Sequence, residues 1–485
     1  FVCKRITQYD KMKNLYKCFS LVLIIFIVIL PTSCKSDPVI LPELVVSKEE
    51  VAFSKENGTI ILSITSNMQW KAISSESWCT LSPASGVAGT RQVDISVTEN
   101  TLSMSREAVI TITSGSVSKT VKVLQTGRVL DVPADATGMS STATELAKKL
   151  KIGLNIGNTL EAIGGETAWG NPLITNDLIK SIKSNGFNAI RLPVSWNQHA
   201  DPATWIIKAS WLERVKQVVQ YCVDNDMYVI VNIHWDGGWL ENNCTEAKKD
   251  ENNAKQRTYW NQIAVTLRDF DEHVLFASAN EPNVSTATEM SVLFSYHQTF
   301  IDAVRSTGGR NAYRVLVVQG PSTDVGKTNQ LMAKLPVDNI ANRLMAEVHY
   351  YTPWTFCGLE KDESWGKMAY YWGKDFHSTV DASRNATGDE EAAVDANFAL
   401  MKKQFVDKGI PVVLGEFGAI ARNNLSGDAL KLHLASRAFY FKYVTKQAIA
   451  NGLIPFFWDT GGLIDRNKNT VRDHQALDAL MQGTL

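Results

Sequence analysis

Two glutamates at the ends of apolar runs could together perform acid–base chemistry. Glu281 closes the stretch Val274-Leu-Phe-Ala-Ser-Ala-Asn-Glu281, and Glu416 lies in Pro411-Val-Val-Leu-Gly-Glu-Phe-Gly418. A buried carboxylate without a partner costs several kcal/mol or more, so neither glutamate has a packing use in the run that carries it. We therefore expect both to face a cleft at the ends of strands, where a substrate meets them.

The elements that must position this pair repeat over residues 142–485, where apolar runs alternate with amphipathic segments. Strands are predicted over 151–157, 189–196, 228–235, 274–280, 314–319, 344–351, 411–417 and 454–459. Helices are predicted over 176–185, 211–225, 256–270, 288–306, 394–408 and 430–451. Eight βα units of this length predict a (β/α)8 TIM barrel, an α/β fold. A doubly wound open sheet would normally carry a glycine-rich phosphate loop, and Asn155-Ile-Gly-Asn158 is not one.

Polar residues gather at one end of these predicted strands. In a TIM barrel the C-terminal ends of all strands converge on the face that holds the active site. We therefore expect the following residues to share one site: Asn158, Arg191, His234, Asn280, Glu281, Gln319, His349, Tyr351, Glu416 and Trp458.

Residues 40–127 follow a different pattern. Short segments at 43–47, 59–65, 92–98, 108–113 and 119–126 alternate apolar and polar residues between Gly- and Ser-bearing turns. This period predicts a small all-β, immunoglobulin-like sandwich. The stretch from Trp70 to Trp78, with 81–86 and 123–127, resembles the BACON-type domain that precedes bacterial polysaccharide enzymes. A tryptophan in so small a sandwich is more often core than a sugar platform, so we favour a spacer role.

Two further segments flank the sandwich. Residues 1–34 read as upstream residues and a lipoprotein signal peptide, because Lys11, Lys13 and Lys17 precede an apolar run at 19–30 that is short for a membrane span. The sequence Leu30-Pro-Thr-Ser-Cys34 resembles a bacterial lipobox, which implies a lipid anchor on Cys34 and a place in the Gram-negative cell envelope, as an outer-membrane lipoprotein. An ordinary signal peptide is the alternative. The small, polar residues 128–141 predict a linker.

The balance of charged residues restricts the classes of binding partner. The chain has 49 basic and 50 acidic residues, a balance that favours neither nucleic acid nor an anionic surface. Cys79, Cys222, Cys244 and Cys357 match no metal pattern, so we expect buried or free thiols, with a Cys244–Cys357 bridge left open. We expect a monomer that needs no cofactor.

Six motifs follow one another along residues 142–485: Gly186-Phe-Asn-Ala-Ile-Arg-Leu-Pro-Val-Ser-Trp196, Val231-Asn-Ile-His-Trp235, Asn280-Glu-Pro282, Glu347-Val-His-Tyr-Tyr351, Gly415-Glu-Phe-Gly418 and Phe456-Phe-Trp-Asp459. In this order they resemble glycoside hydrolase family 5. The resemblance implies a covalent glycosyl-enzyme, with Glu281 as acid/base, Glu416 as nucleophile and carboxyl groups about 5 Å apart. Glu166-Thr-Ala-Trp-Gly-Asn-Pro172 is similar to the subfamily of endoglucanases and xyloglucanases.

The same resemblance implies how the two carboxyl groups are tuned. Arg191 should keep Glu416 ionised and fix its rotamer, and Tyr351 should donate to the same carboxylate. Glu281 should stay protonated until the leaving oxygen takes its proton.

Further residues would contact the sugar. The resemblance implies that Asn280 binds the 2-hydroxyl, that His234 and His349 position the first sugar, and that Trp458 forms its aromatic floor. The loop residues Trp239, Trp354, Trp365 and Trp372 either line more distant subsites or pack within loops. The insertion from Thr352 to Asp395 is the longest departure from regular spacing, and we expect specificity to reside there.

Other functions fit the sequence less well. A metal-dependent hydrolase would need clustered ligands, and His234 and His349 form no H-x-H pair, so no metal is predicted. A non-catalytic glycan-binding lipoprotein would leave the acid pair unexplained. The first prediction is an endo-acting β-1,4-glucanase that acts on cellulose-type β-glucan polysaccharides, with xyloglucanase second and mannanase third.

Overall fold

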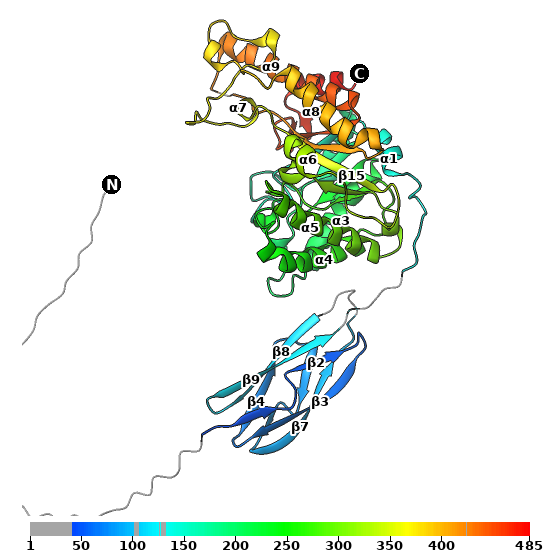
Figure 1. Cartoon of the computed structure of the whole chain (residues 1–485), viewed down its shortest axis with the longest axis vertical. Coiled ribbons are helices and arrows are strands. Elements are labelled where there is room, and N and C mark those ends of the chain that lie inside the picture. Colours follow the sequence, from blue (N-terminus) through cyan, green and yellow to red (C-terminus); the bar gives the residue numbers. More distant parts are fainter. Residues whose placement is uncertain (1–40, 101–105, 126, 128–131, 423) are drawn as a thin grey trace, which may run out of the picture.

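A computed structural model describes residues 41–100, 106–125, 127, 132–422 and 424–485. An all-β part precedes an α/β barrel, as the cartoon shows (Figure 1). The predicted signal peptide, its Cys34 and residues 128–131 of the predicted linker lie outside the described residues. Among the described residues, no helix combines the length and the apolar character that crossing a membrane requires.

The all-β part is a sandwich of two sheets with strand orders β1-β3-β7-β5 and β2-β9-β8-β4-β6. Inward residues alternate with exposed ones along β8, as the period-two pattern predicts. The five predicted segments fall on β1, β3, β7, β8 and β9, whereas the shorter strands were not predicted. The strands are β1 (Leu44–Val46), β2 (Glu50–Phe53), β3 (Gly58–Ser66), β4 (Trp70–Ser74), β5 (Cys79–Ser82), β6 (Ser85–Gly86), β7 (Gly89–Val97), β8 (Arg106–Ser114) and β9 (Val117–Gln125).

The two tryptophans of the sandwich do not form an open platform. Trp70 is buried in the core between the sheets, which confirms the packing interpretation. Trp78 is half-buried, and the guanidinium of Arg106 lies 4.2 Å from its ring centroid, so a cation covers one face of the ring.

Eight parallel strands close into a barrel in sequence order, as predicted. Several strands end before their predicted limits. Leu192 ends β11 because Pro193, which has no backbone N–H, follows it. The strands are β10 (Gly153–Ile156), β11 (Ala189–Leu192), β12 (Tyr228–Asn232), β13 (Val274–Ala277), β14 (Leu316–Gln319), β15 (Leu344–Tyr350), β16 (Val412–Phe417) and β17 (Leu453–Asp459).

Helices surround the barrel (Figure 1). All six predicted helices are present, and the short α1, α6, α7 and α10 were not predicted. Capping boxes begin α1 at Thr142 and α5 at Thr286, where a glutamate three residues later bonds back to the cap. The helices are α1 (Ala143–Lys149), α2 (Asn176–Ser184), α3 (Ala209–Asp224), α4 (Lys249–Thr266), α5 (Ala287–Ser306), α6 (Val325–Leu331), α7 (Trp354–Cys357), α8 (Glu391–Gln404), α9 (Gly427–Ala450) and α10 (His474–Gly483).

A buried arginine, Arg314, lies just before β14. Arg314 is fully buried and donates to the carbonyls of Val274 and Phe270 at 2.7 Å each and to Oδ1 of Asn311 at 2.7 Å. Backbone carbonyls thus take the place of a carboxylate partner.

The cysteines follow the sequence prediction. Within the part of the chain that the structure describes, Cys79, Cys222, Cys244 and Cys357 are buried and form no disulfide. The Cys244–Cys357 bridge that the sequence left open is therefore absent.

Candidate active site

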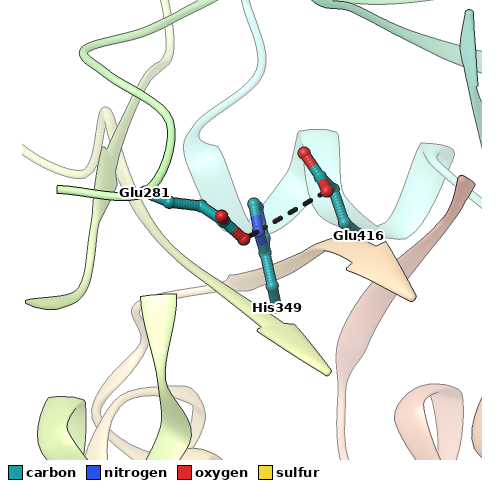
Figure 2. Close-up of side chains that lie close together, drawn as sticks. All are labelled: Glu281, His349 and Glu416. Carbon is teal, nitrogen blue, oxygen red and sulfur yellow. Dashed lines mark hydrogen bonds and ion pairs between the residues drawn. The ribbon is translucent and has the colours of Figure 1, made fainter. Parts of the chain in front are cut away.

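The two predicted catalytic glutamates lie together at the C-terminal ends of the barrel strands. Glu281 follows β13 and Glu416 lies on β16, and their carboxyl groups point toward one another with His349 of β15 beside them (Figure 2). One ligand-type atom from each of the three residues lies within 4.8 Å of the other two. An oxygen of Glu281 thus lies within 4.8 Å of an oxygen of Glu416, which favours the close pair of a retaining glycosidase over the wider gap of an inverting one.

Arg191 and Tyr351 hold Glu416 as the sequence predicted. Arg191 is fully buried on β11, and its Nη1 donates to Oε1 of Glu416 at 2.8 Å. The hydroxyl of Tyr351 donates to Oε2 at 3.0 Å. Nη2 of Arg191 donates to Oδ1 of Asn280 at 2.8 Å, and Nη1 also reaches Asn155. Both carboxylate oxygens of Glu416 are thus fixed.

A third carboxylate, Glu347, lies behind this pair, and sequence reasoning gave it no role. It is fully buried on β15, with Oε1 at 2.8 Å from Nε of Arg191 and at 3.2 Å from Nε2 of His349. Gln319 donates to its Oε2 at 2.6 Å. A charged residue inside an otherwise apolar strand was the signal that could have revealed it.

Gly415 leaves the space that Glu347 occupies. A Cβ atom at position 415 would overlap Oε1 of Glu347 and crowd Nε2 of His349. The residue before Glu416 must therefore be a glycine if the side chains of Glu347, His349 and Glu416 are to lie together.

A fourth carboxylate supports the backbone of Glu281. The amide of Glu281 donates to Oε1 of Glu241 at 2.7 Å, and Glu241 is buried. Burial raises the pKa of Glu241 to about 7. Glu241 follows β12 in the loop that also carries Trp239, and the sequence pattern did not identify it.

His234 and Trp458 form one wall of the site. Their rings stack with centroids 5.7 Å apart and planes 9° from parallel. Nδ1 of His234 lies 3.2 Å from the Asn232 side-chain amide, and burial lowers the pKa of His234 well below its usual value. The imidazole is therefore neutral, with Nε2 left to donate. The Trp458 ring lies so close to Gly157 that a side chain at 157 would overlap it.

The four loop tryptophans divide into two classes. Trp372 is fully buried and Trp239 nearly so, so these two pack within loops. Trp354 and Trp365 are 51 % and 65 % exposed, and Trp354 meets Tyr351 edge to face with centroids 6.3 Å apart. Within the motif that begins at Glu166, the glutamate itself is buried and paired with Arg214 at 2.7 Å.

The charges in the unliganded site differ from the expectation in two respects. Arg191 and His349 lower the pKa of Glu416, as predicted for Arg191, but burial outweighs them and raises this pKa above its usual value. His349 lowers the pKa of Glu281 against the opposing effect of burial. The surrounding carboxylates raise the pKa of His349 to about 9. In the free enzyme the imidazole is thus the protonated group, not Glu281.

The same three groups are spaced as metal ligands could be, but their contacts are those of acid–base groups. Glu281, His349 and Glu416 form the one such cluster within the described residues. Arg191 already neutralises Glu416, and His349 faces Glu281 at 2.7 Å. A guanidinium beside the cluster opposes a second cation there.

Comparison with known families places both parts of the chain. Residues 155–462 match the family model for cellulase, glycosyl hydrolase family 5. Residues 69–126 match the BACON model, whose description is "Putative binding domain, N-terminal".

Individual relatives match at about one-third identity. A xyloglucan-specific endo-β-1,4-glucanase from Bacteroides ovatus is 36 % identical over 444 residues, which cover 86 % of each chain. Endoglucanase A from Paenibacillus barcinonensis is 35 % identical over 388 residues, 72 % of this chain and 92 % of the relative. Among solved structures, the chain is similar to a Bacteroides ovatus family 5 xyloglucanase in complex with a XXXG heptasaccharide. The two chains are 33 % identical, with a TM-score of 0.69. The alignment covers 92 % of this chain and 100 % of that one.

Proposed function

Because the chain belongs to glycoside hydrolase family 5 and is an endo-acting β-1,4-glucan hydrolase, we propose that its preferred substrate is a branched β-1,4-glucan of the xyloglucan type. The observation that carries this proposal is the match to the xyloglucan-specific relative over 86 % of this chain, against 72 % of this chain for the endoglucanase match. This choice reverses the order that the sequence alone favoured.

The site geometry supports a retaining mechanism on this backbone. Glu416 attacks the anomeric carbon while Glu281 delivers a proton to the leaving oxygen, so the C1–O bond breaks as the glycosyl-enzyme ester forms. Water then gives a proton to Glu281 and attacks C1, which releases Glu416 as a carboxylate. The contacts from Arg191 and Tyr351 hold Glu416 in place for both steps.

The neighbouring side chains would bind the sugar at the cleaved bond. Asn280 is fixed by Arg191, which supports a role in binding the 2-hydroxyl, a contact that strengthens as charge develops at C1. The stacked pair of His234 and Trp458 offers an aromatic floor and one N–H donor.

Initial rates on four polysaccharides test the substrate. Tamarind xyloglucan should be hydrolysed faster than carboxymethylcellulose, mixed-linkage glucan or glucomannan, and Glu416→Gln serves as the inactive control. Proton NMR of the first product should show the β-anomer at the new reducing end. Equal rates on xyloglucan and carboxymethylcellulose would refute the preference, and an α-anomer would refute retention.

Unbranched β-1,4-glucan is the second candidate. This candidate is favoured by the match to the endoglucanase from Paenibacillus barcinonensis. The match has 35 % identity and covers 92 % of the endoglucanase. A carboxymethylcellulose rate above the xyloglucan rate would establish this candidate in place of the first.

We further propose that the enzyme is a monomer anchored through acylated Cys34 in the outer membrane of a Gram-negative cell envelope. The lysines before the apolar run at 19–30 and the lipobox-like Leu30-Pro-Thr-Ser-Cys34 support the anchor. Expressed in a Gram-negative host, the full chain should fractionate with outer membranes and incorporate labelled palmitate, whereas Cys34→Ala should do neither. Labelling that survives in Cys34→Ala would refute the anchor. The monomer is checked by light scattering, which measures the molar mass in solution of a detergent-free protein that lacks residues 1–34.

A further inference from the structure

The imidazole of His349 has a carboxylate oxygen at each ring nitrogen. Nδ1 lies 2.7 Å from Oε1 of Glu281 (Figure 2), and Nε2 lies 3.2 Å from Oε1 of Glu347. An ionised carboxylate can only accept hydrogen bonds. Two proton arrangements satisfy both contacts: a doubly protonated imidazole beside an ionised Glu281, or a neutral imidazole with its hydrogen on Nε2 beside a protonated Glu281.

Nε2 keeps its hydrogen in both arrangements because Glu347 is its acceptor. The other neighbour of Nε2 is Nη2 of Arg191 at 3.5 Å, which is itself a donor and already serves Asn280. Glu347 is fully buried and cannot be replaced by water as the acceptor. The hydrogen that can move is therefore the one between Nδ1 and Glu281.

We propose that Glu347 is a positioning residue for proton transfer, which holds His349 so that one proton passes between its Nδ1 and the carboxyl group of Glu281. The inference rests on the hydrolase activity and on Glu281 as its acid/base. It does not depend on which glucan the enzyme prefers.

The proton balance closes over both halves of the reaction. In the resting enzyme the proton is on Nδ1, and its transfer to Oε1 of Glu281 over 2.7 Å moves no heavy atom. The Glu281 side chain is 43 % exposed, so its carboxyl group can rotate to give that proton to the leaving oxygen as Glu416 bonds to C1. Attacking water later returns a proton to Glu281, from which Nδ1 regains it when Glu416 leaves.

The charges that face His349 favour a proton held on its Nδ1. Two carboxylates face Nδ1, with Oε2 of Glu416 at 3.8 Å in addition to Oε1 of Glu281, and Glu347 faces Nε2. Arg191, the neutral His234 and Tyr351, which donates to the same Oε2 of Glu416, are further ionisable groups of the cluster. The three carboxylates outweigh the opposing effect of burial, and the pKa of His349 is raised to about 9.

Leaving-group chemistry separates this role from a structural one. A dinitrophenolate departs without protonation, whereas a phenolate needs the acid, and kcat/KM reports the glycosylation step alone. For Glu347→Gln we expect kcat/KM on phenyl β-cellotrioside to fall about tenfold or more, with a loss of about threefold or less on the dinitrophenyl glycoside. The basic limb of its pH profile should move to lower pH, and Glu347→Asp should recover much of the activity.

Equal losses on the two glycosides, or an unmoved basic limb, would overturn the proposal. Should Glu347→Gln fail to fold, as its melting temperature would show, His349→Asn supplies the same test, because the asparagine can hydrogen-bond Glu281 but cannot store a proton. An equal loss on both glycosides in His349→Asn also overturns it. The polysaccharide rates that test the proposed function are independent of this pattern.

Discussion

The guanidinium of Arg191 donates to Oε1 of Glu416 at 2.8 Å from within a fully buried position on β11. The same side chain contacts Glu347 through Nε and Asn280 through Nη2, so one planar group orients these three partners at once, in addition to its bond to Asn155. Its fork geometry, and not its charge alone, sets the position of the nucleophile.

Replacing Arg191 by lysine should therefore damage catalysis although it keeps the charge. A single ammonium cannot reach all three partners, and misplacement by about 1 Å can cost about 100-fold in rate. We expect kcat/KM on xyloglucan to fall by roughly that factor for Arg191→Lys, while circular dichroism stays unchanged. Activity within about twofold of the wild type would show that charge alone suffices.

The two glutamates to which we assign catalysis should respond differently to amide replacement. Glu281→Gln should lose about 10²–10⁴-fold on polysaccharide but retain activity on a dinitrophenyl glycoside, because that leaving group needs no acid. Added azide should yield a β-glycosyl azide in this variant, because a small nucleophile can replace the base-activated water. Glu416→Gln should be inactive on both substrates, and full turnover in either variant on polysaccharide would refute the assignment.

The pH profile of kcat/KM should be broad. Activity needs Glu416 ionised, and because burial raises its pKa, the acidic limb should lie above the ordinary carboxyl value of 4.5. Activity also needs a proton on the coupled pair of Glu281 and His349, so the basic limb should follow the raised pKa of about 9 of His349. In His349→Asn the basic limb should move toward lower pH, and an unchanged limb would exclude His349 from the titration.

The exposed tryptophans of the insertion from Thr352 to Asp395 should set affinity for long substrates. Trp354 is 51 % exposed at the edge of Tyr351, which places an aromatic face next to the site. Trp354→Ala and Trp365→Ala should raise KM on xyloglucan about 2–10-fold, with little change in kcat, because ring stacking is lost. Val380→Ala, a fully exposed position in the same insertion, is the matched control and should leave KM unchanged.

Arg314 should matter for stability and not for catalysis. Its replacement by methionine would leave several buried carbonyl groups without a donor, so we expect the free energy of unfolding to fall by about 2–4 kcal/mol. Arg472→Met removes an exposed ion pair at 2.8 Å and should change stability by less than about 1 kcal/mol. Urea denaturation measures both, and equal effects of the two substitutions would contradict the role given to Arg314.

The sequence predicted the position of all eight barrel strands because long apolar runs separated by amphipathic segments carry a strong periodic signal. It did not predict α1, α6 and α7, which have 7, 7 and 4 residues and so show too few turns for a helical period, and it also missed the 10-residue α10. The main residues of the site were predicted because each stands where a strand ends. Glu347 was missed because its partners, Arg191 and His349, become neighbours only when the barrel closes.

The protonation of the site carboxylates and the exposure of the loop tryptophans could not be predicted from the sequence, because both depend on the three-dimensional surroundings. Whether Arg191 or burial dominates the pKa of Glu416 depends on how many groups surround it, which no spacing reveals. Trp365 and Trp372 are seven positions apart in the same insertion, yet one is exposed and the other buried. Contacts formed by distant segments, such as that of Ser436 with the Trp372 backbone, decide this.

The absence of a side chain at Gly415 ties two positions of the chain to each other. Because a Cβ there would occupy the place of Oε1 of Glu347, any substitution at 415 would force residue 347 to become smaller or to turn away. Arg191 and His349 would then lose a counter-charge that no solvent could restore at that depth. Natural variants should accordingly exchange these two residues together, and an alanine introduced at 415 should be tolerated only in a background where position 347 has already been shortened.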